Sequence, residues 1–276
     1  MYSKDNLITD SLPTIFDFRL AKLKSDMLSK NISKIDIYEQ YISQAKFYFN
    51  SSKRNKLIGL EQLFNVDAII GCTHFIDNLL LKYGISGLQI FEHDYNYYKR
   101  LDPQISYAKV GQLVPEKPIL IAAPFPGYLD LHPQWSQILD ESADKKIDIH
   151  IDSCWLGAAN QIKIDLTHPA IKSIGLSFSK SLGFYWNRIG LRFSKIKDDT
   201  DSVSIHNRFR IVPEYLMRNA IIAMQELPID YLWDTYETVY ADICRELYLR
   251  PSKIIHAAHS IDRKHLYGLK KLIEQE

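Results

Sequence analysis

Three residues of the chain could together carry out amine chemistry: Lys180, Asp152 and Arg188. Lys180 follows a predicted buried strand, and burial lowers the pKa of a lysine, as formation of an imine requires. Asp152 ends a neighbouring predicted strand, where a carboxylate would keep a heteroaromatic nitrogen protonated. Arg188, with the Ser177 hydroxyl and the predicted helix start at Gly71-Cys72-Thr73, would hold a phosphate. These are the groups that pyridoxal phosphate needs.

Short apolar runs that alternate with amphipathic stretches must position these groups. Strands are predicted at 66–70, 88–91, 119–123, 147–152, 173–178 and 190–193. Helices are predicted at 75–83, 133–142, 214–227 and 231–249. Because strands alternate with helices, and the residues with chemistry stand at strand ends, the pattern predicts an α/β fold with a largely parallel sheet.

Changes in the pattern divide the chain into three predicted parts. Residues 1–60 are expected to form an N-terminal helical arm, because apolar residues after position 14 recur at three- and four-residue spacing. Residues 61–205 hold the strand and helix alternation and the candidate site, so they are expected to form the large cofactor-binding domain. The polar run 195–201 predicts a surface loop, and residues 206–276 predict a reduced helical C-terminal lobe.

The segment from Ser177 to Gly190 resembles the cofactor-attachment segment of the class I/II aminotransferases, which are pyridoxal phosphate enzymes of fold type I. It has Lys180, an arginine eight positions later and a glycine two positions beyond that. Upstream, Asp152-Ser153-Cys154-Trp155 and Gly71-Cys72-Thr73 resemble the family's other cofactor-binding segments and occur in the family's order. The matched part runs from about residue 64 to about residue 193.

The resemblance implies a three-layer fold around a mostly parallel sheet, with a reduced small lobe, and a homodimer. It implies that Lys180 forms the Schiff base with pyridoxal 5′-phosphate and that Asp152 pairs with the pyridine nitrogen. The ring would stack on an aromatic residue, for which Tyr95 is preferred over Tyr97. The phosphate would be held by the following residues: Ser177, Arg188, Gly71, Cys72 and Thr73.

Several positions depart from the family pattern. Phe125 and Trp155 replace the usual asparagine and tyrosine near the cofactor's phenolic oxygen, although the Trp155 indole N–H can still donate a hydrogen bond. Trp186 stands where the family has a small or polar residue. His150, two residues before Asp152, is expected either to support that acid or to be a satisfied core histidine. The arginine that would bind a substrate carboxylate has only candidates: Arg208, Arg210, Arg218, Arg250 and Arg263.

Composition excludes several other classes of function. The 34 Lys and Arg residues balance 33 Asp and Glu residues, so no positive field favours nucleic acid as a partner. No run approaches the roughly 18 apolar residues of a membrane span. The three cysteines lack the spacing of a disulfide framework or a zinc site, which predicts a reducing, cytoplasmic location and no metal centre.

These observations predict an aminotransferase-like enzyme that acts on an amino acid or another amine through Lys180. Another pyridoxal phosphate reaction is the nearest alternative, since decarboxylation, elimination and Cα–C bond formation use the same ring chemistry. A non-catalytic binding protein derived from such an enzyme is a second alternative, favoured by the changes at Phe125 and Trp155. A third interpretation takes Ser177 as an acyl nucleophile activated by Lys180, but no companion motif follows it.

Overall fold

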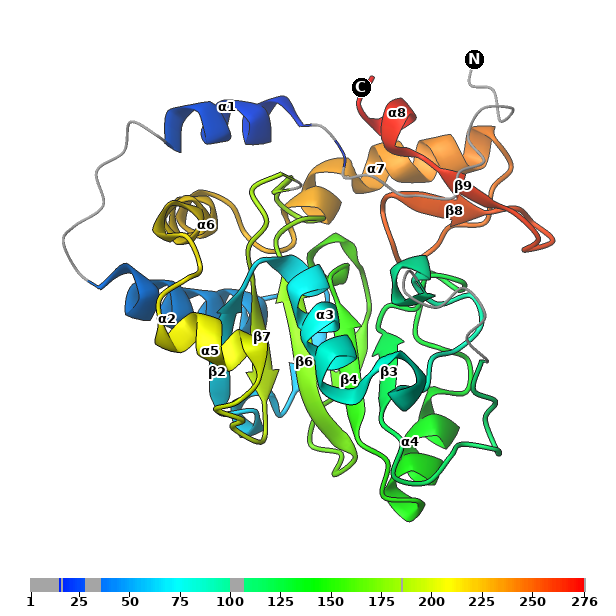
Figure 1. Ribbon diagram of the computed structural model, residues 1–276. Coiled ribbons are helices and arrows are strands. Elements are labelled where there is room, and N and C mark those ends of the chain that lie inside the picture. The colour runs from blue at the N-terminus through cyan, green and yellow to red at the C-terminus, as the bar shows by residue number, and fades with distance from the viewer. Residues whose placement is uncertain (1–14, 16, 28–35, 100–106, 185, 276) are drawn as a thin grey trace.

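The computed structural model describes residues 15, 17–27, 36–99, 107–184 and 186–275, and Figure 1 shows their arrangement. Their central feature is a mixed sheet of five strands in the order β2-β7-β6-β4-β3. Strands β3, β4 and β6 are parallel to one another, whereas β7 is antiparallel to both of its neighbours, β6 and β2. The strands are β2 (Asn65–Ile69), β3 (Ile119–Ala122), β4 (Ile149–Ser153), β6 (Ile171–Ser177) and β7 (Gly190–Ser194).

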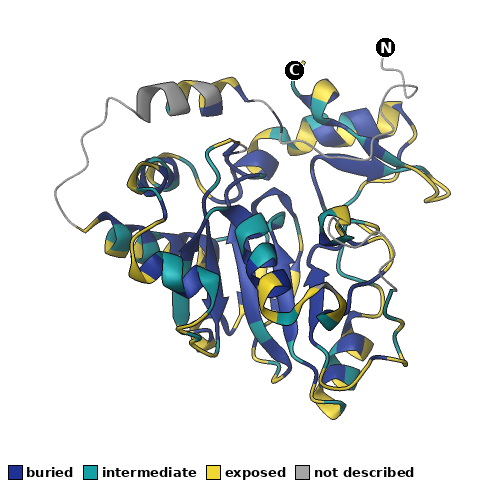
Figure 2. Ribbon diagram, viewed as in Figure 1, coloured by how far each residue is buried: buried dark blue, intermediate teal, exposed yellow. Residues whose placement is uncertain are grey.

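Both faces of the sheet are covered by helices. Successive residues of β3 point to opposite faces of the sheet. Ile119 and Ile121 belong to the apolar core on one face, and Leu120 belongs to the core on the other. Helix α3 (Gly71–Tyr83) supplies Phe75 and Ile76 to the Leu120 side. Helices α2 (Ile37–Asn50), α4 (Trp135–Asp144), α6 (Glu214–Glu226) and α7 (Tyr231–Glu246) contribute to the other core. Strands β3, β4 and β7 and nearly all of β6 are therefore buried, whereas the edge strand β2 is half-buried at its start (Figure 2), and this arrangement confirms the three-layer α/β prediction.

Helix α3 lies close against β6 because the strand has a glycine at the contact. A Cβ atom on Gly175 would come within 2.7 Å of the Phe75 ring. The helix begins immediately after β2 and its far end at Tyr83 packs against His150 of β4, with 5.7 Å between the ring centres. This close packing fixes the first turn of α3 relative to the carboxyl ends of β4 and β6.

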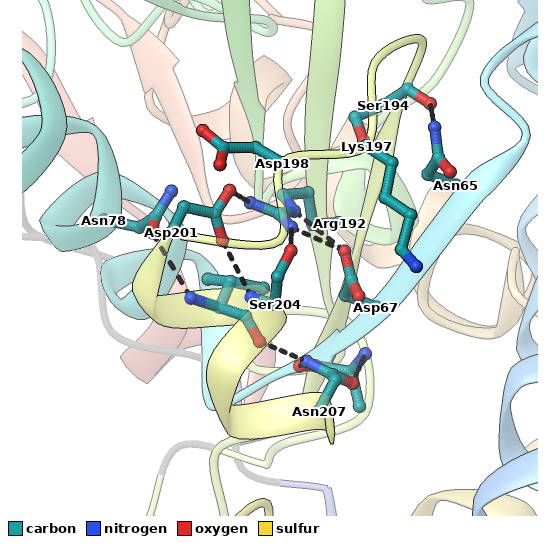
Figure 3. A network of polar contacts seen from close by, with 12 residues as sticks. Asn65, Asp67, Asn78, Arg192, Ser194, Lys197, Asp198, Asp201, Ser204 and Asn207 are labelled. Carbon is teal, nitrogen blue, oxygen red and sulfur yellow. Dashed lines mark hydrogen bonds and ion pairs between the residues drawn. The ribbon is translucent and has the colours of Figure 1, made fainter. Parts of the chain in front are cut away.

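A buried arginine ties the antiparallel strands to α5 (Ser202–Arg208), as Figure 3 shows. The Arg192 guanidinium on β7 contacts Asp67 of β2 at 2.6 Å and Asp201, just before α5, at 2.5 Å. It also donates to the Ser204 hydroxyl at 2.9 Å. The Asn207 side chain of α5 bonds both the N–H and the C=O of Ala68, each at 2.8 Å. The polar run 195–201 thus leads into a helix that is firmly attached to the sheet.

The C-terminal part lies beyond the end of the sheet where the site residues are found (Figure 1). It was predicted as helical, and it also contains an antiparallel pair, β8 (Ala257–His259) and β9 (Leu266–Gly268), followed by α8 (Lys270–Ile273). The division of the chain at residues 60 and 205 stays a prediction. Within the described ranges, none of the helices has the length and hydropathy that a membrane crossing requires.

The remaining elements are short or peripheral. The prediction of a strand at 88–91 is wrong, because Gln89 makes only an isolated parallel bridge to Ile119 and the chain then leaves the sheet. The other elements are α1 (Phe18–Met27), β1 (Lys56–Ile58), β5 (Lys163–Asp165) and the 3-10 turns Leu60–Gln62, Ile85–Gly87, Asn96–Lys99 and Leu156–Ala158. Strands β1 and β5 pair in parallel.

Candidate functional site

A cavity of about 470 Å³ lies at the carboxyl ends of β4 and β6. This volume is within the range of about 300–1,000 Å³ that is typical of small-molecule sites. Parallel strands place their carboxyl ends at one edge, which is why the residues that follow β4 and β6 meet there. The cavity lining includes the predicted site residues Cys72, Thr73, Tyr95, Asp152, Trp155, Ser177, Lys180 and Arg188. Gly71 lies directly beside it, under the Arg188 side chain.

Asp152 is a buried acid with several hydrogen-bond donors around it. Its side chain is 1% exposed, and it accepts hydrogen bonds from the Tyr98 hydroxyl at 3.2 Å and the Cys154 N–H at 3.1 Å. The neighbouring Cys72 and Cys154 thiols act to lower the pKa of this carboxylate. Burial raises the pKa of Asp152, and the hydrogen bonds only partly oppose that effect. A cationic ring N–H beside Asp152 would favour its ionised form.

Tyr98 is a member of this site that the sequence analysis missed. It is 1% exposed and follows Tyr95 by three residues in the 3-10 turn Asn96–Lys99. Burial holds the pKa of its phenol well above the usual value, so the hydroxyl remains a donor. The three-residue spacing from Tyr95 was the available signal, because a 3-10 turn places residues three apart on the same side.

Lys180 lies against the Trp155 ring, with its Nζ atom 4.7 Å from the ring centre. Burial lowers the pKa of Lys180, and the positive charge of Arg188 acts in the same direction. The acid Asp152 opposes this shift. A lowered pKa increases the fraction of neutral amine, which is the form that attacks an aldehyde. Trp155 also packs edge to face with His256, at 5.2 Å between the ring centres.

The first turn of α3 and Arg188 lie together and have the donors that a cradle for an anion needs. Gly71 has φ +70°, and a Cβ atom there would lie 3.0 Å from the Arg188 Nη2 atom. The Arg188 Nε atom is buried and has no hydrogen-bond partner among the described residues. The N-cap residue of α3, Ile70, has no side chain that could accept a hydrogen bond, and the His74 ring accepts only the Ile70 N–H, at 3.3 Å, so the amides of the first turn are available to a ligand. Ser177 completes the cradle, with its hydroxyl 2.9 Å from that of Ser179.

The donor set fits a phosphorylated pyridine aldehyde. An unpartnered guanidinium nitrogen and uncapped helix amides suit the phosphate, a buried acid suits a ring N–H, and a lysine of lowered pKa suits the aldehyde. Tyr95 lines the cavity, whereas the Tyr97 hydroxyl bonds Asp77 at 3.1 Å and does not line it. The geometry thus favours Tyr95 as the stacking residue.

The departures from the family pattern have distinct structural positions. Phe125 is fully buried and packs edge to face on His132, at 4.9 Å between the ring centres. Trp186 is 87% exposed. His150 bonds the Ser173 hydroxyl at 2.7 Å, so it acts as a core histidine rather than as a partner of the acid two residues later. Within the described residues no cluster of three or more His, Cys, Asp or Glu could hold a metal ion.

Asp94 is a second acid in the cavity that was not expected. It is 9% exposed, and it accepts hydrogen bonds from the N–H groups of Tyr95 at 2.6 Å and Ala122 at 3.2 Å. Burial raises the pKa of Asp94 to about 8, and the charge of Asp152 adds to the increase. No sequence pattern marks this residue, since its burial depends on how residues 91–98 fold over β3.

Comparison of the structure with solved structures identifies its fold. Neither a family sequence model nor a curated protein sequence matches the chain. Tyrosine aminotransferase from Leishmania infantum superposes with a TM-score of 0.62 at 11% identity, over 96% of this chain and 90% of that one. An aminotransferase from Mycobacterium tuberculosis superposes with a TM-score of 0.62 at 12% identity, over 92% of this chain and 79% of that one. L-threonine-O-3-phosphate decarboxylase from Porphyromonas gingivalis superposes with a TM-score of 0.57 at 14% identity, over 89% of this chain and 83% of that one.

These likenesses extend over most of the chain, well beyond the segment from residue 64 to residue 193 that carried the sequence resemblance. The structures also include a decarboxylase, so the fold is used for more than one reaction. With its mixed central sheet between two layers of helices, the chain has the fold of the class I/II aminotransferases, fold type I.

Proposed function

We propose that the chain binds pyridoxal 5′-phosphate and is an aminotransferase-like enzyme that acts on an amino acid or another amine. The observation that carries the proposal is the convergence of three side chains from separate segments, Lys180, Asp152 and Arg188, on one cavity. Each has the state that its role requires: a lowered lysine pKa, a buried acid and a guanidinium nitrogen without a described partner. When bound, the cofactor supplies an aldehyde and an electron-withdrawing ring.

Each of these side chains has a defined task. Arg188, Ser177 and the first amides of α3 bind the phosphate and fix the ring at one end. Asp152 accepts the ring N–H at the other end, and Tyr98 orients that carboxylate through its 3.2 Å hydrogen bond. Lys180 would hold the cofactor through its Nζ atom, and the free amine would serve as the base that takes the proton from the substrate Cα. The Trp155 ring covers this amine and limits the access of water.

The test is direct. Purified protein with added pyridoxal 5′-phosphate should be yellow, and borohydride should remove the visible band and add the cofactor's mass to Lys180. The Lys180→Ala variant should lose the band. Lys172→Ala is the matched control, because Lys172 lies on β6, outside the cavity lining, and its removal should change nothing. A colourless wild-type protein that ignores the cofactor would contradict the proposal and favour a binding protein.

A titration with a panel of amino acids and amines distinguishes the reactions that the ring supports. Under transamination the amine form of the cofactor accumulates in a single turnover without a keto acid acceptor. Decarboxylation instead releases CO₂ and restores the original visible band. The decarboxylase among the structural neighbours makes this second outcome the main alternative.

We also propose that the chain forms a homodimer in the cytoplasm. The N-terminal helices and the aromatic C-terminal helices are the proposed interface. Sedimentation equilibrium would give a mass near twice 32.1 kDa for a dimer, and a mass near 32.1 kDa at all concentrations would contradict it.

A further inference from the structure

One wall of the cavity remains after the proposed cofactor contacts are assigned, and it is apolar. It consists of Phe125, Leu129, Ile254 and Leu266, with Pro124 and Pro126 beside them. Phe125, Leu129 and Ile254 are at most 3% exposed. None of these side chains has a group that could bind a phosphate or a ring nitrogen. We call these four residues, Phe125, Leu129, Ile254 and Leu266, the apolar wall.

The apolar wall is formed where two distant parts of the chain meet. Phe125 and Leu129 belong to the loop after β3, and Ile254 and Leu266 belong to the C-terminal part. Polar contacts hold the two parts together. The Lys253 ammonium lies 2.8 Å from the Asp130 carboxylate, and the His259 ring lies 3.1 Å from the Tyr128 carbonyl. Specific contacts thus fix both halves of the wall.

The wall adjoins the amine that would meet a substrate. Trp155 contacts both Lys180 and His256, and His256 is two residues after Ile254. The Ile255 N–H donates to the Ala158 carbonyl at 3.1 Å, which holds this segment next to the turn after β4. A substrate amine that reaches the Lys180 position therefore has its remaining atoms beside Trp155 and the apolar wall.

We propose that the apolar wall is the substrate-binding surface and that it selects primary amines with an apolar alkyl or aryl body. The inference rests on the proposed function, because the amine must reach Lys180. The rest of the unassigned lining is mixed, since it includes the acid Asp94 together with His93 and Asn96, so the selection rests on the apolar wall itself. That surface favours an apolar body over one that ends in a carboxylate.

A homologous series of n-alkylamines from ethylamine to hexylamine tests this assignment. The holoenzyme is titrated with each amine and the shift of its visible band gives an apparent affinity. Burial of one methylene corresponds to about a three- to fourfold gain in affinity, so the affinity should rise by that factor per methylene. The polar comparison 4-aminobutan-1-ol should bind more weakly than butylamine, by about tenfold or more.

A pair of variants links the chain-length effect to the wall. Leu266→Arg places a charge on the wall and should reduce the affinity for hexylamine by about tenfold, with ethylamine changed less than about twofold. Ile261→Arg is the matched control, since Ile261 is in the same hairpin but is 68% exposed, and it should leave the series unchanged. Thermal melting of the two variants checks that both fold, and hexylamine should raise the melting temperature of the control more than that of Leu266→Arg.

The outcomes separate the two proposals. A normal visible band with affinities that do not change along the series would overturn the apolar selection and leave the proposed function standing. The same conclusion follows if Leu266→Arg and Ile261→Arg behave alike. A protein that forms no visible band with the cofactor would overturn the proposed function, and the inference with it.

Discussion

Substitution of Gly71 by alanine tests whether the first turn of α3 and Arg188 act together on an anion. An alanine Cβ would lie 3.0 Å from Nη2 and 3.1 Å from Nε of Arg188. Ordinary van der Waals contact begins near 3.4 Å, so the guanidinium must retreat by about 0.4 Å. A charge-assisted hydrogen bond contributes about 1.5–3 kcal/mol, and loss of about half of one weakens phosphate binding by about four- to twelvefold.

Gly84→Ala is the matched control at the other end of the same helix. Gly84 has φ +73°, close to the +70° of Gly71, but nothing lies within 4 Å of a Cβ placed there. Both substitutions force a side chain into a backbone conformation that should lower the free energy of unfolding by about 1–3 kcal/mol. Only Gly71→Ala should also displace Arg188.

The assay measures two quantities on both variants. Urea denaturation gives the free energy of unfolding, which should fall for both. Fluorescence titration with pyridoxal 5′-phosphate gives the dissociation constant, which should rise for Gly71→Ala alone, and inorganic phosphate should compete with the cofactor less well in that variant. If the two variants bind the cofactor equally well, Gly71 and Arg188 do not form the phosphate cradle.

Three further predictions concern buried groups. Burial raises the pKa of Asp94 to about 8, so the stability that its protonated carboxyl contributes is fully present below about pH 4 and is lost progressively as the pH rises to about 8. Asp94→Asn should flatten that decline, of about 1.4 kcal/mol per pH unit, in urea denaturation. Tyr98→Phe removes a hydrogen-bond donor to Asp152 and should lower the free energy of unfolding by about 1–3 kcal/mol. Because that hydrogen bond lowers the pKa of Asp152, its loss should also move the acid-side decline of cofactor affinity to higher pH. An unchanged pH profile of cofactor affinity would contradict the role of Tyr98. Gly175→Ala should destabilise by about 1–3 kcal/mol because of its 2.7 Å approach to Phe75, and Phe75→Leu should restore part of the loss in a double-mutant cycle.

The parts of the fold that depend on local pattern were predictable. The apolar runs at 119–123 and 147–152 correspond to β3 and β4, and the residues at strand ends meet because parallel strands share an edge. Strand β7 was expected as a strand, but its antiparallel direction was not. That direction follows because the described residues between Ser177 and Gly190 contain no crossover helix, so the chain returns directly along β6.

The remaining features depend on contacts between distant residues. The pairing of β1 with β5 joins Lys56 to Lys163, and no local pattern in three-residue strands specifies such a partner. Strands β8 and β9 are equally short, and Ala257 and Ala258 have little preference for extended structure. In the site, the lysine, the acid and the arginine carry recognisable spacing, whereas Asp94 becomes buried only through tertiary packing.

The lining of the cavity extends along the chain from Cys72 to Leu266. A partly folded chain that lacks either the first turn of α3 or the C-terminal hairpin therefore has no complete binding site for the proposed cofactor. A ligand that recognises only the finished assembly stabilises it by mass action and gives no help to earlier intermediates. Pyridoxal phosphate would accordingly protect the native protein against unfolding while leaving its rate of refolding nearly unchanged.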